Sequence, residues 1–165
     1  MKMPSLGEIN AMDGAKAHEL FARCTIASQY CDTLVKTRPY FSEDNLLSAS
    51  DQATRNLNAK ALLVAFSGHP RIGERKAHSA WASAEQSGVS ADDAKVLADL
   101  AAANLAYEQK FDYVFLICAT GKSGAQMLAE CKRRINNSPE VEIEEAREQL
   151  RLINRIRIHK LLEEA

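Results

Sequence analysis

The sequence DQATRNLNAKALLVAFSGHPRIG, residues 51–73, contains a strongly apolar segment that stops at a glycine, a histidine and a proline. Its alanine and leucine content favours a helix through residue 67, and Gly68 followed by Pro70 ends that helix. Pro70 fixes its own φ angle, lacks an N–H donor and directs His69 toward extended backbone. The pattern therefore predicts a helix that ends by placing His69 on a turn of restricted conformation.

His69 is a candidate for proton transfer. Histidine is the side chain whose ordinary pKa lies closest to neutrality, so a small change of environment lets it give or take a proton at working pH. The alternative, taken from this residue alone, is a loop histidine that only caps the preceding helix.

The rest of the chain has the same helical character. Alanine, leucine, glutamate and lysine are frequent, and the Val/Ile/Thr alternation that is typical of strands is nearly absent. The segment 111–119 is apolar but has no partner strand, so we predict a buried irregular or short helical segment there. We predict helices at 13–24, 28–36, 42–48, 51–67, 80–87, 90–110, 123–136 and from 138 almost to the end. The expected fold class is all-α, with one compact multi-helix domain over residues 1–165.

Composition excludes several kinds of partner. The 21 basic and 22 acidic residues give a net charge of −1, which argues against nucleic acid or an anionic membrane and favours a small-molecule ligand. No apolar run reaches the roughly 18 residues that span a bilayer, and the first residues do not resemble a signal peptide, so we expect a cytoplasmic protein. The 4 cysteines form no C-x-x-C pair and no H-E-x-x-H motif occurs, which predicts reduced packing thiols and no metal site.

A carboxylate follows the histidine turn in the sequence. Glu85 and Gln86 lie in the predicted helix 80–87, and folding back of the connection would bring Glu85 near His69. A partly desolvated glutamate and a histidine can divide proton donation and acceptance between them. The alternative is a solvated helix glutamate.

The last predicted helix carries arginines of two kinds. Arg147, Arg151 and Arg155 recur at four-residue spacing on what we expect to be a solvated face, within reach of Glu144 and Glu148. Arg157 instead lies in the apolar stripe, four residues from Ile153 and from Leu161. An inward cation can pair with an internal carboxylate or bind a substrate carboxylate, and both interpretations stay open.

Several features occur in a distinctive order along the chain. They are the run GHPRIG at 68–73, Glu85-Gln86, Asn104-x-x-Tyr107, the segment FLICA at 115–119, Arg134-x-Asn136 and Arg157-Ile158. In this combination the chain resembles the 2-oxo-4-hydroxy-4-carboxy-5-ureidoimidazoline (OHCU) decarboxylase family over essentially its whole length. The resemblance implies an all-helical homodimer that converts OHCU to (S)-allantoin and carbon dioxide, the last step of urate breakdown, with no metal or organic cofactor.

The resemblance also implies roles for individual residues. His69 and Glu85 match the catalytic positions, and Pro70 and Gln86 match positions at the substrate. The family usually has a serine three residues before the glutamate, where this chain has Ala82, and the neighbouring Ser83 is the candidate replacement. Further substrate-binding positions implied by the resemblance are Phe115, Leu116, Ile117, Cys118 and Ala119, whose backbone lines the pocket in the family, and Arg157.

Two alternative functions are compatible with the residues. One is a helical ligand-binding or interaction module without activity, in which segment 111–119 docks a partner and the His-Pro turn only ends a helix. The other is a decarboxylase of a related ureide, which the departure at Ala82 makes conceivable.

Overall fold

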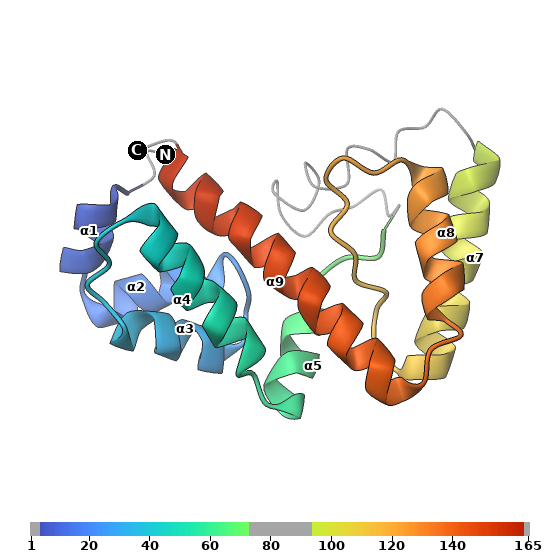
Figure 1. Ribbon diagram of the computed structural model, residues 1–165, viewed down its shortest axis with the longest axis horizontal. Coiled ribbons are helices and arrows are strands. Elements are labelled where there is room, and N and C mark those ends of the chain that lie inside the picture. The colour runs from blue at the N-terminus through green and yellow to red at the C-terminus, as the bar shows by residue number, and fades with distance from the viewer. Residues whose placement is uncertain (1–3, 73–93, 164–165) are drawn as a thin grey trace. The chain divides into compact units, whose positions relative to one another are not determined.

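A computed structural model describes residues 4–72 and 94–163 of the chain. Within those ranges the regular structure consists of helices, so the predicted all-α class is confirmed (Figure 1). The predicted helix 80–87 and the predicted start at residue 90 lie outside the described residues. The helices are α1 (Leu6–Ala11), α2 (Gly14–Ala22), α3 (Ser28–Lys36), α4 (Glu43–Arg55), α5 (Ala59–Ser67), α7 (Ala94–Phe111), α8 (Gly124–Arg134) and α9 (Pro139–Glu163).

The described residues form two compact units. The first comprises the residues up to Ala65 together with those from Arg151 onward, and the second runs from Phe66 to Leu150. Helices α5 and α9 therefore contribute residues to both units. Across residues 4–72 and 94–163, no helix combines the length and the apolar character needed to cross a membrane.

The first unit is built on α2, α3 and α4, where α3 packs against both of the others (Figure 1). Helix α3 has the predicted bounds, and its buried residues Tyr30, Cys31 and Leu34 share one face, because Leu34 lies one turn after the other two. Removing the Leu34 side chain from water contributes about 1.5–3 kcal/mol to folding. Core side chains of this unit include Phe21, Tyr30, Leu34, Leu46, Leu62, Ile158 and Leu161.

Two predictions about helix boundaries in this unit are wrong. Helix α4 continues through residues 48–50, and the break falls at residues 56–58 instead. Asn56 ends α4, and the Asn58 side chain accepts the N–H of Ala61 at 2.8 Å in the first turn of α5. Asparagine caps of this kind satisfy backbone groups that a continuous helix would have paired internally. Helix α1, with Ser5 as its N-cap, was not predicted at all.

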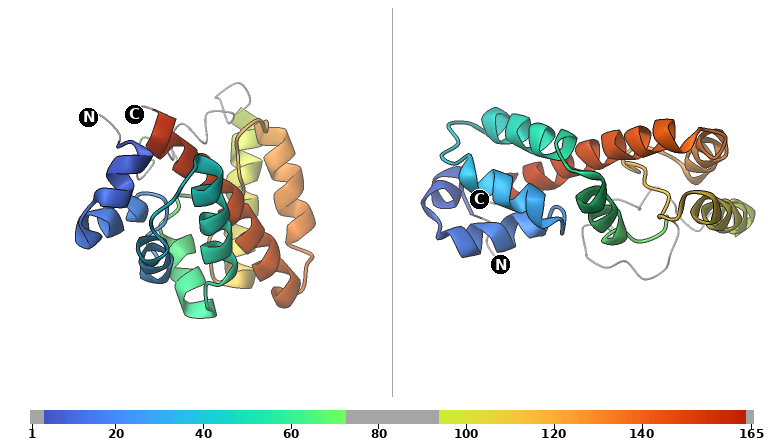
Figure 2. Two further views of the ribbon diagram at one scale, coloured as in Figure 1. Left: turned by 60° about the vertical axis from the view of Figure 1, so that its left-hand side comes forward. Right: turned by 90° about the horizontal axis from the view of Figure 1, so that it is seen from below.

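The second unit is built on α7 and α8, which run side by side in both views of Figure 2. Ser123 caps α8 in a capping box with Gln126, close to the predicted start of that helix. Between the two helices, residues 113–119 adopt no helix, and residues 115–119 are buried, which confirms the predicted irregular segment. The core consists of Ile72, Leu100, Tyr107, Phe111, Phe115, Ile117, Ala119, Met127 and Cys131.

The prediction of a fully solvated arginine face on α9 is only partly right. Arg147 pairs with Glu144 at 3.0 Å, as expected from their spacing. Arg151 and Arg155, however, both donate to the Asp51 carboxylate, at 3.2 and 2.6 Å. The Asp51 side chain is only 13% exposed, so these arginine tips bind a largely buried carboxylate. Asp51 comes from α4, one hundred positions earlier, and no spacing within α9 could indicate it.

The four cysteines are free and buried, as the sequence predicts. Burial raises the pKa of the Cys31 thiol and of the Cys131 thiol to about 11. Because the thiolate is the reactive form, we expect these thiols to react with iodoacetamide at pH 8 at least roughly 100-fold more slowly than in the urea-unfolded chain. Mass spectrometry of timed aliquots measures the rates, and comparable labelling of native and unfolded chain would contradict the burial of these thiols.

Candidate functional site

His69 lies on the turn directly after α5, where the sequence predicts it. Its backbone N–H donates to the Phe66 carbonyl oxygen at 3.1 Å, which closes the end of the helix. His69 is 8% exposed and Pro70 is also buried. The imidazole is therefore held in a largely water-poor environment, where a proton-transfer group is less screened than on a surface loop.

The turn is fixed to α7 by the two residues that follow Pro70. The Arg71 guanidinium donates to both carboxylate oxygens of Glu108, at 2.7 and 3.0 Å. The buried Asn104 side-chain amide donates to the Ile72 carbonyl oxygen at 2.9 Å. The bidentate Arg71–Glu108 ion pair and the buried hydrogen bond from the Asn104 side chain together restrict the position of His69 relative to α7.

The segment 115–119 lies in the same unit as the turn and shares its core. Phe115, Ile117 and Ala119 belong to the same hydrophobic cluster as Ile72. Phe66, just before the turn, has its ring centroid 5.1 Å from that of Tyr113. The structure therefore places His69, Pro70 and the predicted substrate-lining segment on one packed framework.

Side chains anchor the backbone of this segment. The Arg134 guanidinium donates to the Leu116 carbonyl oxygen at 2.8 Å. The Cys118 N–H donates to the Gln149 side-chain oxygen, and the Cys118 carbonyl oxygen accepts from the Lys122 ammonium, each at 2.8 Å. Buried backbone groups need such partners, and here helices α8 and α9 supply what a neighbouring strand would supply in a sheet.

A buried ion pair includes Arg134, the residue that binds the Leu116 carbonyl oxygen of segment 115–119. Arg134 and Glu142 are 1% and 0% exposed, and their shortest N–O distance is 2.6 Å. Asn137 donates to the other Glu142 oxygen at 3.1 Å, and the Tyr107 hydroxyl donates to the same carboxylate. Burial, reinforced by the hydrogen bond to Glu142, raises the pKa of Tyr107. Each charge is thus paired and hydrogen-bonded, the condition under which buried charges are tolerated.

Sequence reasoning assigned no role to this network, although a signal for it exists. Arg134 follows Met127 and Cys131 at the spacing of one buried helix face. Glu142 precedes the buried residues Ala146 and Leu150 at intervals of four. A charge inside each of two apolar stripes indicates a buried pair, but neither stripe alone identifies the partner.

The remaining predicted residues lie in the first unit or outside the described residues. Arg157 belongs to the first unit, is 6% exposed as expected of an inward cation, and donates to the Cys24 carbonyl oxygen at 2.7 Å. Ser83, Glu85 and Gln86 lie outside the described residues.

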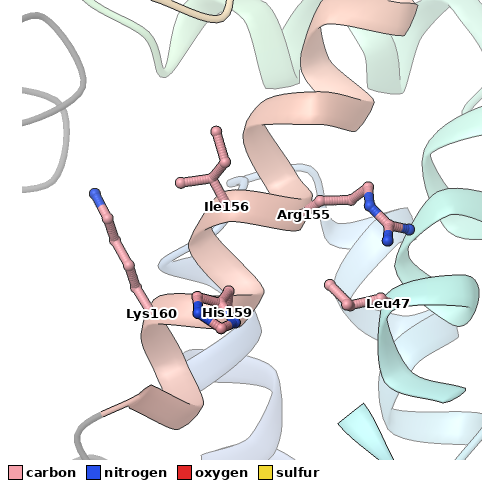
Figure 3. A pocket seen from close by; sticks show the side chains of 5 residues that line it. All are labelled: Leu47, Arg155, Ile156, His159 and Lys160. Carbon is pink, nitrogen blue, oxygen red and sulfur yellow. The ribbon is translucent and has the colours of Figure 1, made fainter. Parts of the chain in front are cut away.

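A surface cavity in the first unit differs from the predicted site. It has a volume of about 280 Å³ and lies between α4 and α9 (Figure 3). Arg155 brings positive charge to it, but Asp51 accepts from that side chain at 2.6 Å, and His159 Nδ1 lies 2.5 Å from Glu43 Oε1. The lining residues are Leu47, Arg155, Ile156, His159 and Lys160, which include no residue of the predicted site. Within residues 4–72 and 94–163, no group of three or more His, Cys, Asp or Glu side chains is placed to hold a metal ion.

Solved structures with the same architecture include a crystal structure of OHCU decarboxylase in the presence of (S)-allantoin. That chain is 30% identical to this one, with a TM-score of 0.78 over 88% of this chain and 98% of that chain. A crystal structure of (S)-allantoin synthase shares the fold, with a TM-score of 0.73 at 15% identity over 96% of this chain and 53% of that chain. The fold therefore places the protein among all-α proteins of the OHCU decarboxylase type.

Sequence comparison identifies the family. Residues 10–159 match the OHCU decarboxylase family model, so the chain belongs to the OHCU decarboxylase family and the resemblance seen in the sequence is confirmed. The uric acid degradation bifunctional protein TTL of Arabidopsis thaliana is 31% identical over 84% of this chain and 45% of its own length, so this chain spans about half of that relative. The 2-oxo-4-hydroxy-4-carboxy-5-ureidoimidazoline decarboxylase of Haloferax volcanii is 22% identical over 93% of this chain and 94% of its own length.

Proposed function

We propose that this protein decarboxylates OHCU to (S)-allantoin. The observation that carries the proposal is a buried histidine on a turn clamped to α7, in a chain whose residues 10–159 match the OHCU decarboxylase family. The relatives support a role in urate breakdown, since one bears the name of a uric acid degradation protein and another that of the decarboxylase itself.

The reaction suits a site made of side chains and backbone groups. The substrate carries a carboxylate on a ring carbon that also bears a hydroxyl group. When the bond to the carboxylate breaks, carbon dioxide leaves and the electron pair moves into the adjacent unsaturated ring system. In this proposal His69 exchanges a proton with the substrate hydroxyl group. A proton delivered to one face of the intermediate then sets the configuration of the product.

The other predicted residues receive supporting roles in the same proposal. Glu85 orients the ring or relays the proton, and Gln86 binds an amide edge of the substrate. Arg157, whose guanidinium also donates to the Cys24 carbonyl oxygen, holds a polar substrate group. Pro70, Ser83 and the backbone of segment 115–119 complete the pocket and exclude water, which limits side reactions of the intermediate.

The family resemblance also supports the proposed assembly and setting. We propose that residues 1–165 act as one OHCU decarboxylase domain, that two copies form a homodimer, and that the protein works in the cytoplasm on a small-molecule substrate. A decarboxylase of a related ureide remains the second candidate, because Ala82 stands where the family usually has serine.

The direct test supplies OHCU in situ from urate, by means of urate oxidase and the upstream hydrolase, and follows its ultraviolet absorbance. We expect the wild-type protein to accelerate OHCU loss by at least about 100-fold over spontaneous decay. Loss at the spontaneous rate would contradict the proposal. Titration with stable ureides such as allantoin then separates the candidates. Saturation without OHCU turnover indicates a related ureide, whereas no binding of any ureide together with recovery of a partner in a pull-down favours an interaction module.

A further inference from the structure

Two side chains from helices anchor alternate residues of segment 115–119, Leu116 and Cys118. The side chains of Phe115, Ile117 and Ala119 enter the hydrophobic cluster, an alternation that is typical of extended backbone. In extended backbone the N–H and C=O groups of alternate residues point to the same edge. The bonds from Arg134 to Leu116 and from Cys118 to Gln149 therefore occupy the edge that residues 116 and 118 share.

We infer that Gln149 is a positioning residue for the substrate-lining segment, an inference that rests on the proposed function. Gln149 is half-buried on α9, between the buried residues Ala146 and Leu150, in the part of α9 that belongs to the second unit. Its side-chain oxygen accepts the Cys118 N–H at 2.8 Å. By holding Cys118, Gln149 fixes the opposite edge of the segment, where the Ile117 backbone groups face the pocket in the proposed function.

Gln149 differs in kind from the other anchors. The Arg134 bond to Leu116 belongs to a buried ion pair, so its removal would perturb the whole unit. The Lys122 bond to Cys118 comes from the same loop and spans only four residues. Gln149 connects the segment to a distant helix through one neutral hydrogen bond, and its loss leaves the Cys118 N–H without that acceptor.

The test compares three variants with the wild type. Gln149→Leu removes the acceptor, and Gln149→Glu restores an oxygen at nearly the same place. Gln126→Leu is the matched control, because the Gln126 side-chain oxygen also accepts a backbone N–H, that of Ser123, at 2.8 Å. Steady-state kinetics with OHCU, thermal denaturation and amide hydrogen exchange at Cys118 are measured for each protein.

We expect Gln149→Leu to raise the KM for OHCU about 5- to 20-fold, because one unsatisfied backbone donor shifts binding by that order. Amide exchange at Cys118 should accelerate about tenfold in this variant, while Gln149→Glu and Gln126→Leu stay within about twofold of wild type in KM and in Cys118 exchange. A merely structural role would instead lower Tm in Gln149→Leu and in Gln126→Leu alike, with KM unchanged in both.

Three outcomes would overturn the inference. The first is equal KM values in Gln149→Leu and Gln126→Leu, and the second is no rescue by Gln149→Glu. The third is unchanged Cys118 exchange in Gln149→Leu. An inactive wild-type protein would instead overturn the proposed function and with it the role of Gln149 in that reaction, while Cys118 exchange would still decide whether Gln149 holds the segment.

Discussion

Replacing His69 by glutamine is expected to lower kcat for OHCU by roughly 2 to 4 orders of magnitude. Glutamine retains hydrogen-bonding capacity and similar bulk, but it cannot take up or release a proton at neutral pH. The turn should persist in this variant. It is held by the hydrogen bond from the His69 N–H to the Phe66 carbonyl oxygen and by the Arg71–Glu108 ion pair, neither of which involves the imidazole. Initial rates at saturating OHCU, corrected for spontaneous decay, measure the effect.

A second histidine provides the control for this experiment. His18 lies on α2, and its Nε2 atom lies 3.2 Å from Ser28 Oγ and 3.2 Å from Asp32 Oδ1. His18→Gln should leave kcat within about twofold of wild type, because surface substitutions of this kind have small effects. A loss below tenfold in His69→Gln, with circular dichroism showing an intact fold, would reduce His69 to a binding role.

Replacing Glu142 by leucine is expected to produce the largest loss of stability. The Arg134 guanidinium, 1% exposed, would lose its carboxylate partner, and the Tyr107 hydroxyl would lose its acceptor. Breaking a buried pair in this way costs about 3–5 kcal/mol of unfolding free energy. For a chain of this size that corresponds to a fall in Tm of roughly 10 °C, measured by differential scanning calorimetry.

Two further variants show whether the loss comes from the unpaired charge. Glu144→Leu removes a carboxylate two positions away whose side chain is 62% exposed and pairs with Arg147, so it should cost less than about 0.5 kcal/mol. The double variant Arg134→Met with Glu142→Leu removes both charges and should recover at least about half of the loss. Equal destabilisation by Glu142→Leu and Glu144→Leu would contradict the buried pair.

The sequence predicts most of the helices because their signals are local. The apolar stripe of α3 and the capping residue Ser123 of α8 depend only on neighbours within about one turn. The same is true of the helix end before His69, which the structure confirms. The sequence does not reveal the split between α4 and α5, because Asn56 and Asn58 can each occupy either a cap or a helix interior. Asparagine inside a helix is only mildly unfavourable.

The candidate site could be predicted less completely, because its supports connect distant parts of the chain. The positions of His69 and of segment 115–119 follow from local pattern and from the family resemblance. The contacts that hold them come from residues such as Glu108, Arg134 and Gln149, more than 15 positions away from the groups they bind. A helical spacing places such a residue on a face but does not identify its partner on another helix.

The most direct test of this account is the optical activity of the product. OHCU is generated in situ, and circular dichroism follows the formation of allantoin with wild-type protein and with His69→Ala. We expect the wild-type protein to form (S)-allantoin rapidly and as a single enantiomer. His69→Ala should give only the racemic allantoin that forms slowly by spontaneous decay. Slow racemic product from both proteins would contradict the account, because the family fold would then be present without the proposed activity.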